Sequence, residues 1–184
     1  MGNGESSYHR FLNGDESAFS EVIDIYRESL IFFTNRYIGN LSVSEEIAED
    51  CFVALAVYPR RYNFKTSLKT YLFTIARNKA IDRIRKSKRV VLVEDEALDV
   101  LSDEYEQFEK EIFRNEEKRI LHTAIEELND DYRTVLHLVY FEGMSNGEAA
   151  KIMKKSVKQI ENLVYRANLR LREILEKRGI SYEG

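Results

Sequence analysis

Apolar residues recur at helical spacing along most of this 184-residue chain, and polar residues fill the positions between them. The first sustained stripe comprises Phe19, Val22, Ile23, Tyr26, Leu30, Phe33 and Tyr37. This spacing predicts a long amphipathic helix, and Gly39-Asn40 is typical of its carboxyl end. Because the same periodicity returns through most of the sequence, we expect an all-α protein.

The next helix is predicted from Ser42 to about Val57. Ser42 and Glu45 fit the S-x-x-E capping box, in which two side chains satisfy free amides at a helix start, and Pro59 stops the helix. Cys51, the only cysteine, falls on the apolar face, so we expect a core residue. A single cysteine excludes an internal disulfide and fits a reducing compartment.

A basic loop and a long helix follow. Residues 60–67, RRYNFKTS, combine cations with Tyr62 and Phe64, a mixture that suits unstacked single-stranded bases better than intact duplex. Either ring has an alternative role as an anchor of the loop in the core. The inner face of the following helix is predicted to carry Leu68, Tyr71, Leu72, Ile75 and Ala76.

The most informative pattern lies between Ser145 and Arg172. Ser145 with Glu148, and Ser156 with Gln159, both fit the capping box, and their spacing leaves room for a two-turn helix between them. After Ser156, one face carries Val157, Ile160, Val164, Ala167 and Leu171, and the other carries Lys158, Gln159, Glu161, Asn162, Tyr165 and Arg166. The pattern predicts a helix-turn-helix that binds duplex DNA. The alternative is an ordinary helical hairpin with a solvated face.

Charge is strongly segregated along the chain. The net charge is −4, yet residues 60–89 carry eleven basic side chains and one acidic side chain, whereas residues 90–131 carry four basic and fifteen acidic. The basic block is a local footprint for phosphate, although a solubilising surface is the alternative. We therefore expect two small helical domains, 13–89 and 114–180, joined by an acidic linker, 90–113.

Several classes of function lack support. His9, His122 and His137 have no metal-ligand spacing with Cys51 or with each other, and we find neither a Gly-rich phosphate loop nor a nucleophile motif. No metal, cofactor or catalytic residue is therefore expected. No apolar run reaches membrane-spanning length and no signal-peptide core is present, so we expect a cytoplasmic protein without membrane insertion.

Four motifs in a fixed order resemble one family. Residues 46–52, EIAEDCF, look like its acidic DLVQEVF helix, and residues 67–83 look like SFRTWLYRIARN…D..R. Residues 128–145 resemble LP..R……YEGLS, and the last helix pair resembles EIA..L..S..TVKSRL.RAR..LR. By these motifs the chain resembles bacterial sigma factors of the extracytoplasmic-function group, the smallest members of the sigma-70 family. The resemblance implies a region 2-like helical bundle and a region 4-like helix-turn-helix.

Some residues depart from the family pattern. Tyr71 replaces a tryptophan, Asn129 replaces a proline and Lys154 stands where glycine is frequent. Glu161 replaces a residue that is commonly basic, and Leu163 and Asn168 replace two arginines. The reading helix is therefore less positive, and its promoter preference cannot be copied from relatives.

The resemblance implies an RNA polymerase sigma factor with three binding surfaces and no catalytic residue. The first would dock on the clamp helices of the largest polymerase subunit through Glu46, Glu49, Asp50 and Val53. The second would capture a flipped base of the minus-ten element and hold the nearby backbone, with Arg61, Asn63, Phe64, Lys65, Thr66, Ser67, Lys69, Tyr71, Arg77, Asn78, Arg83, Arg85 and Lys86. The third would read the minus-thirty-five element with Ser156, Lys158, Gln159, Glu161, Asn162, Tyr165 and Arg166.

The implied partners are core RNA polymerase, including its β flap, promoter DNA, and an anti-sigma factor. From its charge, the linker, with Asp99, Asp103, Glu104 and Glu106, is expected to thread a basic polymerase channel. Three other classes stay open: an autonomous helix-turn-helix regulator of duplex DNA, an RNA-binding helical adaptor, and an enzyme, for which no residue constellation is found. A dimeric repressor would need a self-complementary surface, and no heptad seam is present.

Overall fold

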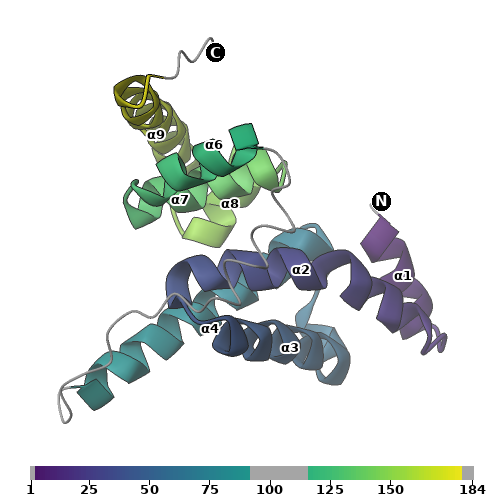
Figure 1. Cartoon of the computed structure of the whole chain (residues 1–184). Helices are drawn as coiled ribbons and strands as arrows, with labels where there is room; N and C mark the ends of the chain where they lie inside the picture. Colours follow the sequence, from purple (N-terminus) through teal and green to yellow (C-terminus); the bar gives the residue numbers. More distant parts are fainter. Residues whose placement is uncertain (1–2, 92–115, 180–184) are drawn as a thin grey trace. The chain divides into compact units, whose positions relative to one another are not determined.

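The computed structural model describes residues 3–91 and 116–179, which belong to two separate compact units (Figure 1). Within these two ranges every regular element is a helix, so the all-α prediction is confirmed. The predicted linker lies almost entirely outside the described residues, as do its four named carboxylates. The domain boundaries therefore remain predictions.

The first unit comprises α1 (Asn3–Leu12), α2 (Ala18–Ile38), α3 (Leu41–Val57) and α4 (Leu68–Val91), with a short 3₁₀ turn at Pro59–Arg61. Helix α2 packs against the other three. The largest fully buried side chains of this core include Phe33, Phe73, Leu30, Leu55, Leu68 and Leu72. Cys51 is buried among them with a free thiol, as predicted.

The junction between α2 and α3 differs from the sequence prediction. Gly39 ends α2 in the left-handed region, at φ 66°, as expected. However, α3 begins at Leu41 and its N-cap is Asn40, whose Oδ1 accepts from the amide of Val43 at 3.1 Å. The predicted Ser42 capping box is therefore wrong, because asparagine is at least as good a cap as serine and stands two residues earlier.

Helix α1 was not predicted, and it is an integral part of the first unit. Its Tyr8 is fully buried, and Tyr8 Oη donates a hydrogen bond to the carbonyl of Leu55 at 3.0 Å. Burial raises the pKa of Tyr8 to about 12. The helix also contacts both α2 and α4, and its residues Glu5 and His9 contact the loop that precedes α4.

The second unit comprises α6 (Glu116–Glu126), α7 (Asp130–Leu136), a π-helical turn (His137–Phe141), α8 (Asn146–Met153) and α9 (Val157–Lys177). The long helix α9 packs against α6, α7 and α8. Helix α7 starts at an Asn129 cap whose side chain accepts from Tyr132 N at 2.9 Å. After Leu136 the α-helix widens into the π-helical turn, which ends before Gly143, a residue with a positive φ.

Candidate nucleic-acid interface

Helices α8 and α9 form the predicted helix-turn-helix, and both capping boxes are present. Ser145 Oγ accepts from Glu148 N at 3.3 Å, and the Glu148 carboxylate accepts from Ser145 N at 3.0 Å. Ser156 Oγ accepts from Gln159 N at 3.2 Å, and Gln159 Oε1 accepts from Ser156 N at 2.7 Å. Between the helices, Lys154 lies in the left-handed region at φ 55°, a conformation that glycine adopts at lower cost.

The outer face of α9 is polar and open to solvent. All seven residues proposed to read the minus-thirty-five element are exposed: Ser156, Lys158, Gln159, Glu161, Asn162, Tyr165 and Arg166. The side-chain oxygens of Ser156 and Gln159 accept the hydrogen bonds of the capping box, which fixes the first turn of the helix. This leaves five side chains of different chemistry along a surface that a major groove can accept.

Two residues of α9 differ from the sequence interpretation. The spacing places Val157 on the buried face, but its side chain is 46% exposed. Val157 is the first residue of α9, at the end of the helix, and the neighbouring helices cover it less than they cover later residues of the same face. Asn168, which stands where the family has arginine, donates from Nδ2 to Tyr140 Oη at 2.9 Å. It therefore joins α9 to the π-turn.

The loop before α4 separates the roles of its two aromatic residues. Tyr62 is buried and its hydroxyl donates to the carbonyl of Thr66 at 2.9 Å, so it anchors the loop. Phe64 is 44% exposed and has a positive φ of 58°. Asn63 Oδ1 accepts from Lys65 N at 3.2 Å, and this short turn presents the Phe64 ring at the surface.

The start of α4 is capped by Ser67, whose Oγ accepts from Thr70 N at 3.2 Å. The residues of the loop and of α4 that are predicted to bind nucleic acid fall into two groups by exposure. Arg61, Asn63, Phe64, Lys65, Arg83, Arg85 and Lys86 are exposed, whereas Thr66, Ser67, Lys69, Tyr71, Arg77 and Asn78 are half-buried. The half-buried group includes Tyr71, whose ring centroid lies 5.0 Å from that of Tyr62. Such residues are placed to support the loop as much as to touch a ligand.

Two cations of α4 pair with carboxylates of α3. Lys79 Nζ lies 2.7 Å from Asp50 Oδ2, and Arg83 lies 3.6 Å from Glu46 Oε2. Arg85 is 3.8 Å from Asp82 on its own helix. The polymerase-binding and DNA-binding surfaces proposed from the sequence thus meet along one edge, where opposite charges face each other.

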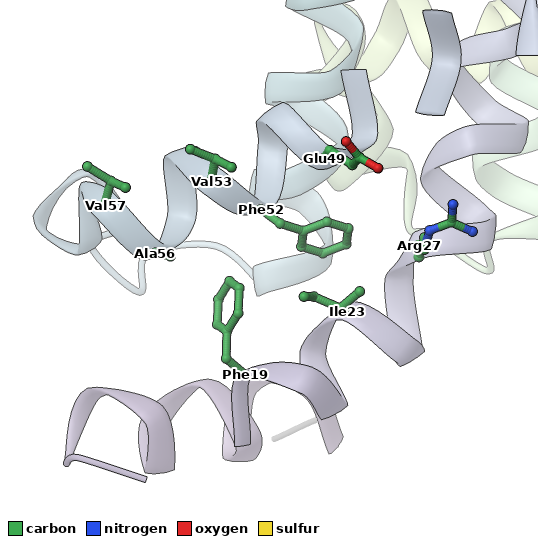
Figure 2. Close-up of a pocket in the computed structure, with 8 residues that line it drawn as sticks. All are labelled: Phe19, Ile23, Arg27, Glu49, Phe52, Val53, Ala56 and Val57. Carbon is green, nitrogen blue, oxygen red and sulfur yellow. The ribbon is translucent and has the colours of Figure 1, made fainter. Parts of the chain in front are cut away.

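A groove of about 470 Å³ runs between α2 and α3 on another side of α3 (Figure 2). It is lined by Phe19, Ile23, Arg27, Glu49, Phe52, Val53, Ala56 and Val57. Figure 2 shows Phe19 and Ile23 extending from α2 toward Phe52, with Arg27 and Glu49 at one end. Val53 and Val57 are 58% and 60% exposed, so apolar surface is open to solvent here. Of the four proposed polymerase contacts, Glu49 and Val53 line this groove, while Glu46 and Asp50 face α4.

Neither membrane insertion nor metal binding gains support from the described ranges. No helix in them is long and apolar enough to cross a membrane. They also contain no cluster of His, Cys, Asp or Glu that could hold a metal ion.

Two family models match the chain. The model for sigma-70 region 2 matches residues 22–90, and the model for sigma-70 region 4 matches residues 118–171. The first range contains the loop and α4 as far as residue 90, and the second contains α8 and the part of α9 as far as residue 171. Both groups of candidate residues that bind nucleic acid therefore fall inside matched regions.

Curated relatives and solved structures agree with these matches. The extracytoplasmic-function (ECF) RNA polymerase sigma factor SigW of Bacillus subtilis is 29% identical over 170 residues, covering 88% of this chain and 91% of SigW. SigM of the same organism is 28% identical, covering 89% and 98%. The fold resembles the sigma factor RpoE in its complex with the anti-sigma factor NepR from Bartonella quintana, at a TM-score of 0.67, 22% identity, and coverage of 86% and 96%. It also resembles CnrH in complex with the cytosolic domain of CnrY, at a TM-score of 0.65, 21% identity, and coverage of 95% and 98%.

Proposed function

Because the chain belongs to the sigma-70 family, in its extracytoplasmic-function group, we infer that it is an RNA polymerase sigma factor that directs initiation at specific promoters. It combines two DNA-binding surfaces of different chemistry on separate units. The proposed contact with the minus-ten element rests on one observation: the loop before α4 exposes Phe64 at the start of a helix rich in cations. The role is that of a binding protein rather than an enzyme.

The loop is proposed to capture one unpaired base of the minus-ten element. Taking a base out of the stack costs a few kcal/mol, and stacking on an aromatic side chain returns about 1–3 kcal/mol. The exposed ring of Phe64 supplies that surface. Arg83, Arg85 and Lys86 are exposed on the same helix that follows the loop, where they would neutralise phosphates. A site that accepts only the flipped base favours strand separation without ATP.

The second unit is proposed to read the minus-thirty-five element through α9. Lys158, Asn162 and Arg166 can donate hydrogen bonds to base edges or phosphates, and each good base contact adds about 1–3 kcal/mol of discrimination. Glu161, also exposed, can accept from a cytosine amine or exclude other bases by repulsion. The polymerase β flap is the proposed neighbour of this unit.

The α2–α3 groove and the acidic edge of α3 are proposed to bind core polymerase at its clamp helices. An apolar side chain of the partner would enter between Phe19 and Val53, while Glu46 and Asp50 would meet basic residues. Since the similar RpoE and CnrH structures are complexes with NepR and with the cytosolic domain of CnrY, we propose that an anti-sigma factor also controls this chain. The site of action would be the cytoplasm, where the polymerase acts.

Run-off transcription with purified core RNA polymerase and a pool of genomic promoter fragments tests this proposal. We expect discrete starts that require the protein and that vanish when Asn63, Phe64 and Lys65 are changed together to Ala. Absence of core binding and of starts, combined with tight duplex binding by the chain alone, would instead identify an autonomous helix-turn-helix regulator.

A further inference from the structure

Helix α1 lies outside the residues matched by the region 2 model, which begins at residue 22, yet it contacts the base-capture loop directly. We propose that α1 is a working part of the minus-ten site, in which Glu5 and His9 are positioning residues for the loop and for the ring of Phe64. This inference rests on the proposed capture of a base by that loop, and it adds two residues that the sequence interpretation did not include.

Glu5 holds both ends of the loop. Its Oε1 accepts from the amide of Leu68, the first residue of α4, at 2.9 Å. The same oxygen lies 3.4 Å from Tyr62 Oη, and that hydroxyl also reaches the carbonyl of Thr66 at 2.9 Å. One carboxylate thus connects Tyr62, near the start of the loop, with Leu68, the residue that follows its end. Its negative charge also faces the amino terminus of α4, where the helix dipole favours an anion.

His9 supports the exposed aromatic ring. The ring centroids of His9 and Phe64 lie 4.6 Å apart, with an interplanar angle of 17°. Phe64 has a positive φ, which a non-glycine residue adopts at a cost, so its conformation needs support from neighbours. Tyr62 also packs against Phe64 in a tilted arrangement, with a centroid distance of 4.5 Å and an interplanar angle of 49°. Because His9 covers one face of Phe64, the remaining exposed part is held ready for a base.

Helix α1 is itself anchored away from the loop. Ser7 Oγ donates to Glu21 Oε2 at 2.7 Å, and Arg10 Nη2 donates to Glu21 Oε1 at 2.8 Å. These contacts join α1 to α2 and do not involve the loop. Glu21 therefore offers a matched control, since its removal loosens α1 while leaving the contacts of Glu5 and His9 with the loop in place.

Five variants of the full chain separate positioning from charge and from stability. Glu5→Ala removes the acceptor and the charge, whereas Glu5→Gln keeps an oxygen acceptor and removes only the charge. His9→Ala removes the supporting ring, and His9→Phe keeps a flat ring. Glu21→Ala is the control. Each variant is assembled with core polymerase, and its affinity is measured for single-stranded DNA that the wild-type holoenzyme has selected from a random-sequence library. Hydrogen exchange of the Leu68 amide is measured on the free protein.

We expect Glu5→Ala and His9→Ala to weaken single-strand binding about 3- to 10-fold, the range that one lost aromatic or capping contact produces. Glu5→Gln, His9→Phe and Glu21→Ala should stay within about twofold of wild type. Exchange of the Leu68 amide should become faster in Glu5→Ala but not in Glu21→Ala. The duplex affinity of the second unit should be the same in all five variants.

Wild-type affinity in both Glu5→Ala and His9→Ala would overturn the inference while leaving the proposed function intact. An equal loss in Glu5→Ala and Glu21→Ala would do the same, because α1 would then only support the fold. Tighter binding in both Glu5 variants would also contradict it, because the carboxylate would then act by repelling phosphate. If the wild-type holoenzyme selects no single strand, the proposed base capture itself is wrong, and the inference falls with it.

Discussion

Nζ of Lys79 lies 2.7 Å from Oδ2 of Asp50, and this ion pair joins the helix proposed to bind DNA to the helix proposed to bind polymerase. Arg83 and Glu46 form a second link at 3.6 Å. The side chains of both pairs are partly open to solvent, so each pair contributes no more than about 1 kcal/mol to stability. The carboxylates can therefore exchange their α4 partners for basic residues of polymerase at little cost.

Replacing Asp50 by Asn tests that view. We expect the free energy of unfolding to fall by less than about 1 kcal/mol, because an exposed pair is lost, while affinity for core polymerase falls more clearly. Chemical denaturation and a binding titration with core enzyme measure the two effects. Asp24→Asn, at an exposed carboxylate of α2 outside the groove, is the control and should bind as wild type does. Equal binding by the two variants would remove Asp50 from the interface.

Lys154→Gly should stabilise the second unit. A non-glycine residue in the left-handed region destabilises the folded state by about 1–2 kcal/mol, and glycine removes this strain. Glycine also gives the unfolded chain more conformational freedom, which offsets about 0.4–1 kcal/mol of the gain. The net gain should be roughly 0.5–1 kcal/mol in thermal unfolding. Lys151→Gly removes the same charge from the last turn of α8, at a residue with helical backbone, and should destabilise by up to about 1 kcal/mol. A lower midpoint for Lys154→Gly would show that the Lys154 side chain itself stabilises the turn.

The Ser156 cap should matter for stability and for DNA binding together. Ser156→Ala leaves the amide of Gln159 without its acceptor and should cost about 1 kcal/mol. Because the first turn of α9 carries the first of the proposed reading residues, Lys158 and Gln159, duplex affinity should fall too. Ser156→Asp keeps a capping acceptor and should restore stability, as measured by thermal unfolding. If Ser156→Ala unfolds as wild type does, the capping box contributes little to α9.

The stability of the first unit should decrease in alkaline solution because of Cys51. Burial raises the pKa of its thiol from 9.0 to about 12. Between these values the unfolded chain releases the proton and the folded chain retains it, so the free energy of unfolding falls as pH rises above about 9. Denaturation at pH 8 and pH 10 should show this loss. The pH dependence should be smaller in Cys51→Ala, and an unchanged dependence would assign it to other groups, such as Tyr8.

Local signals in the sequence were strong enough to predict most helices and both capping boxes of the helix-turn-helix. A cap depends on residues three apart, and a helix face depends on residues three and four apart. The start of α3 shows the limit of such signals, since Asn40 and Ser42 both fit a cap and only the folded chain shows which of them accepts.

Roles that depend on distant contacts could not be predicted in this way. Tyr62 and Phe64 are chemically alike and stand two residues apart, yet Tyr62 is buried and Phe64 is 44% exposed, and both rings pack against α1. That helix was missed because it is short and polar, with few apolar residues, Tyr8 among them. The contact between Glu5 and Leu68 spans 63 positions of the chain, and no local pattern reveals it.

The central claim is that Phe64 stabilises melted promoter DNA by capturing an unpaired base. The most direct test is transcription by the holoenzyme carrying Phe64→Ala, compared with wild type, on one promoter prepared as duplex and as a template already unpaired at the minus-ten element. We predict that Phe64→Ala loses most starts on the duplex and recovers a large part of them on the unpaired template. Ile25→Ala, at an exposed residue of α2 outside the loop and the α2–α3 groove, should give the duplex-to-unpaired ratio of wild type. Wild-type activity of Phe64→Ala on the duplex would contradict the claim.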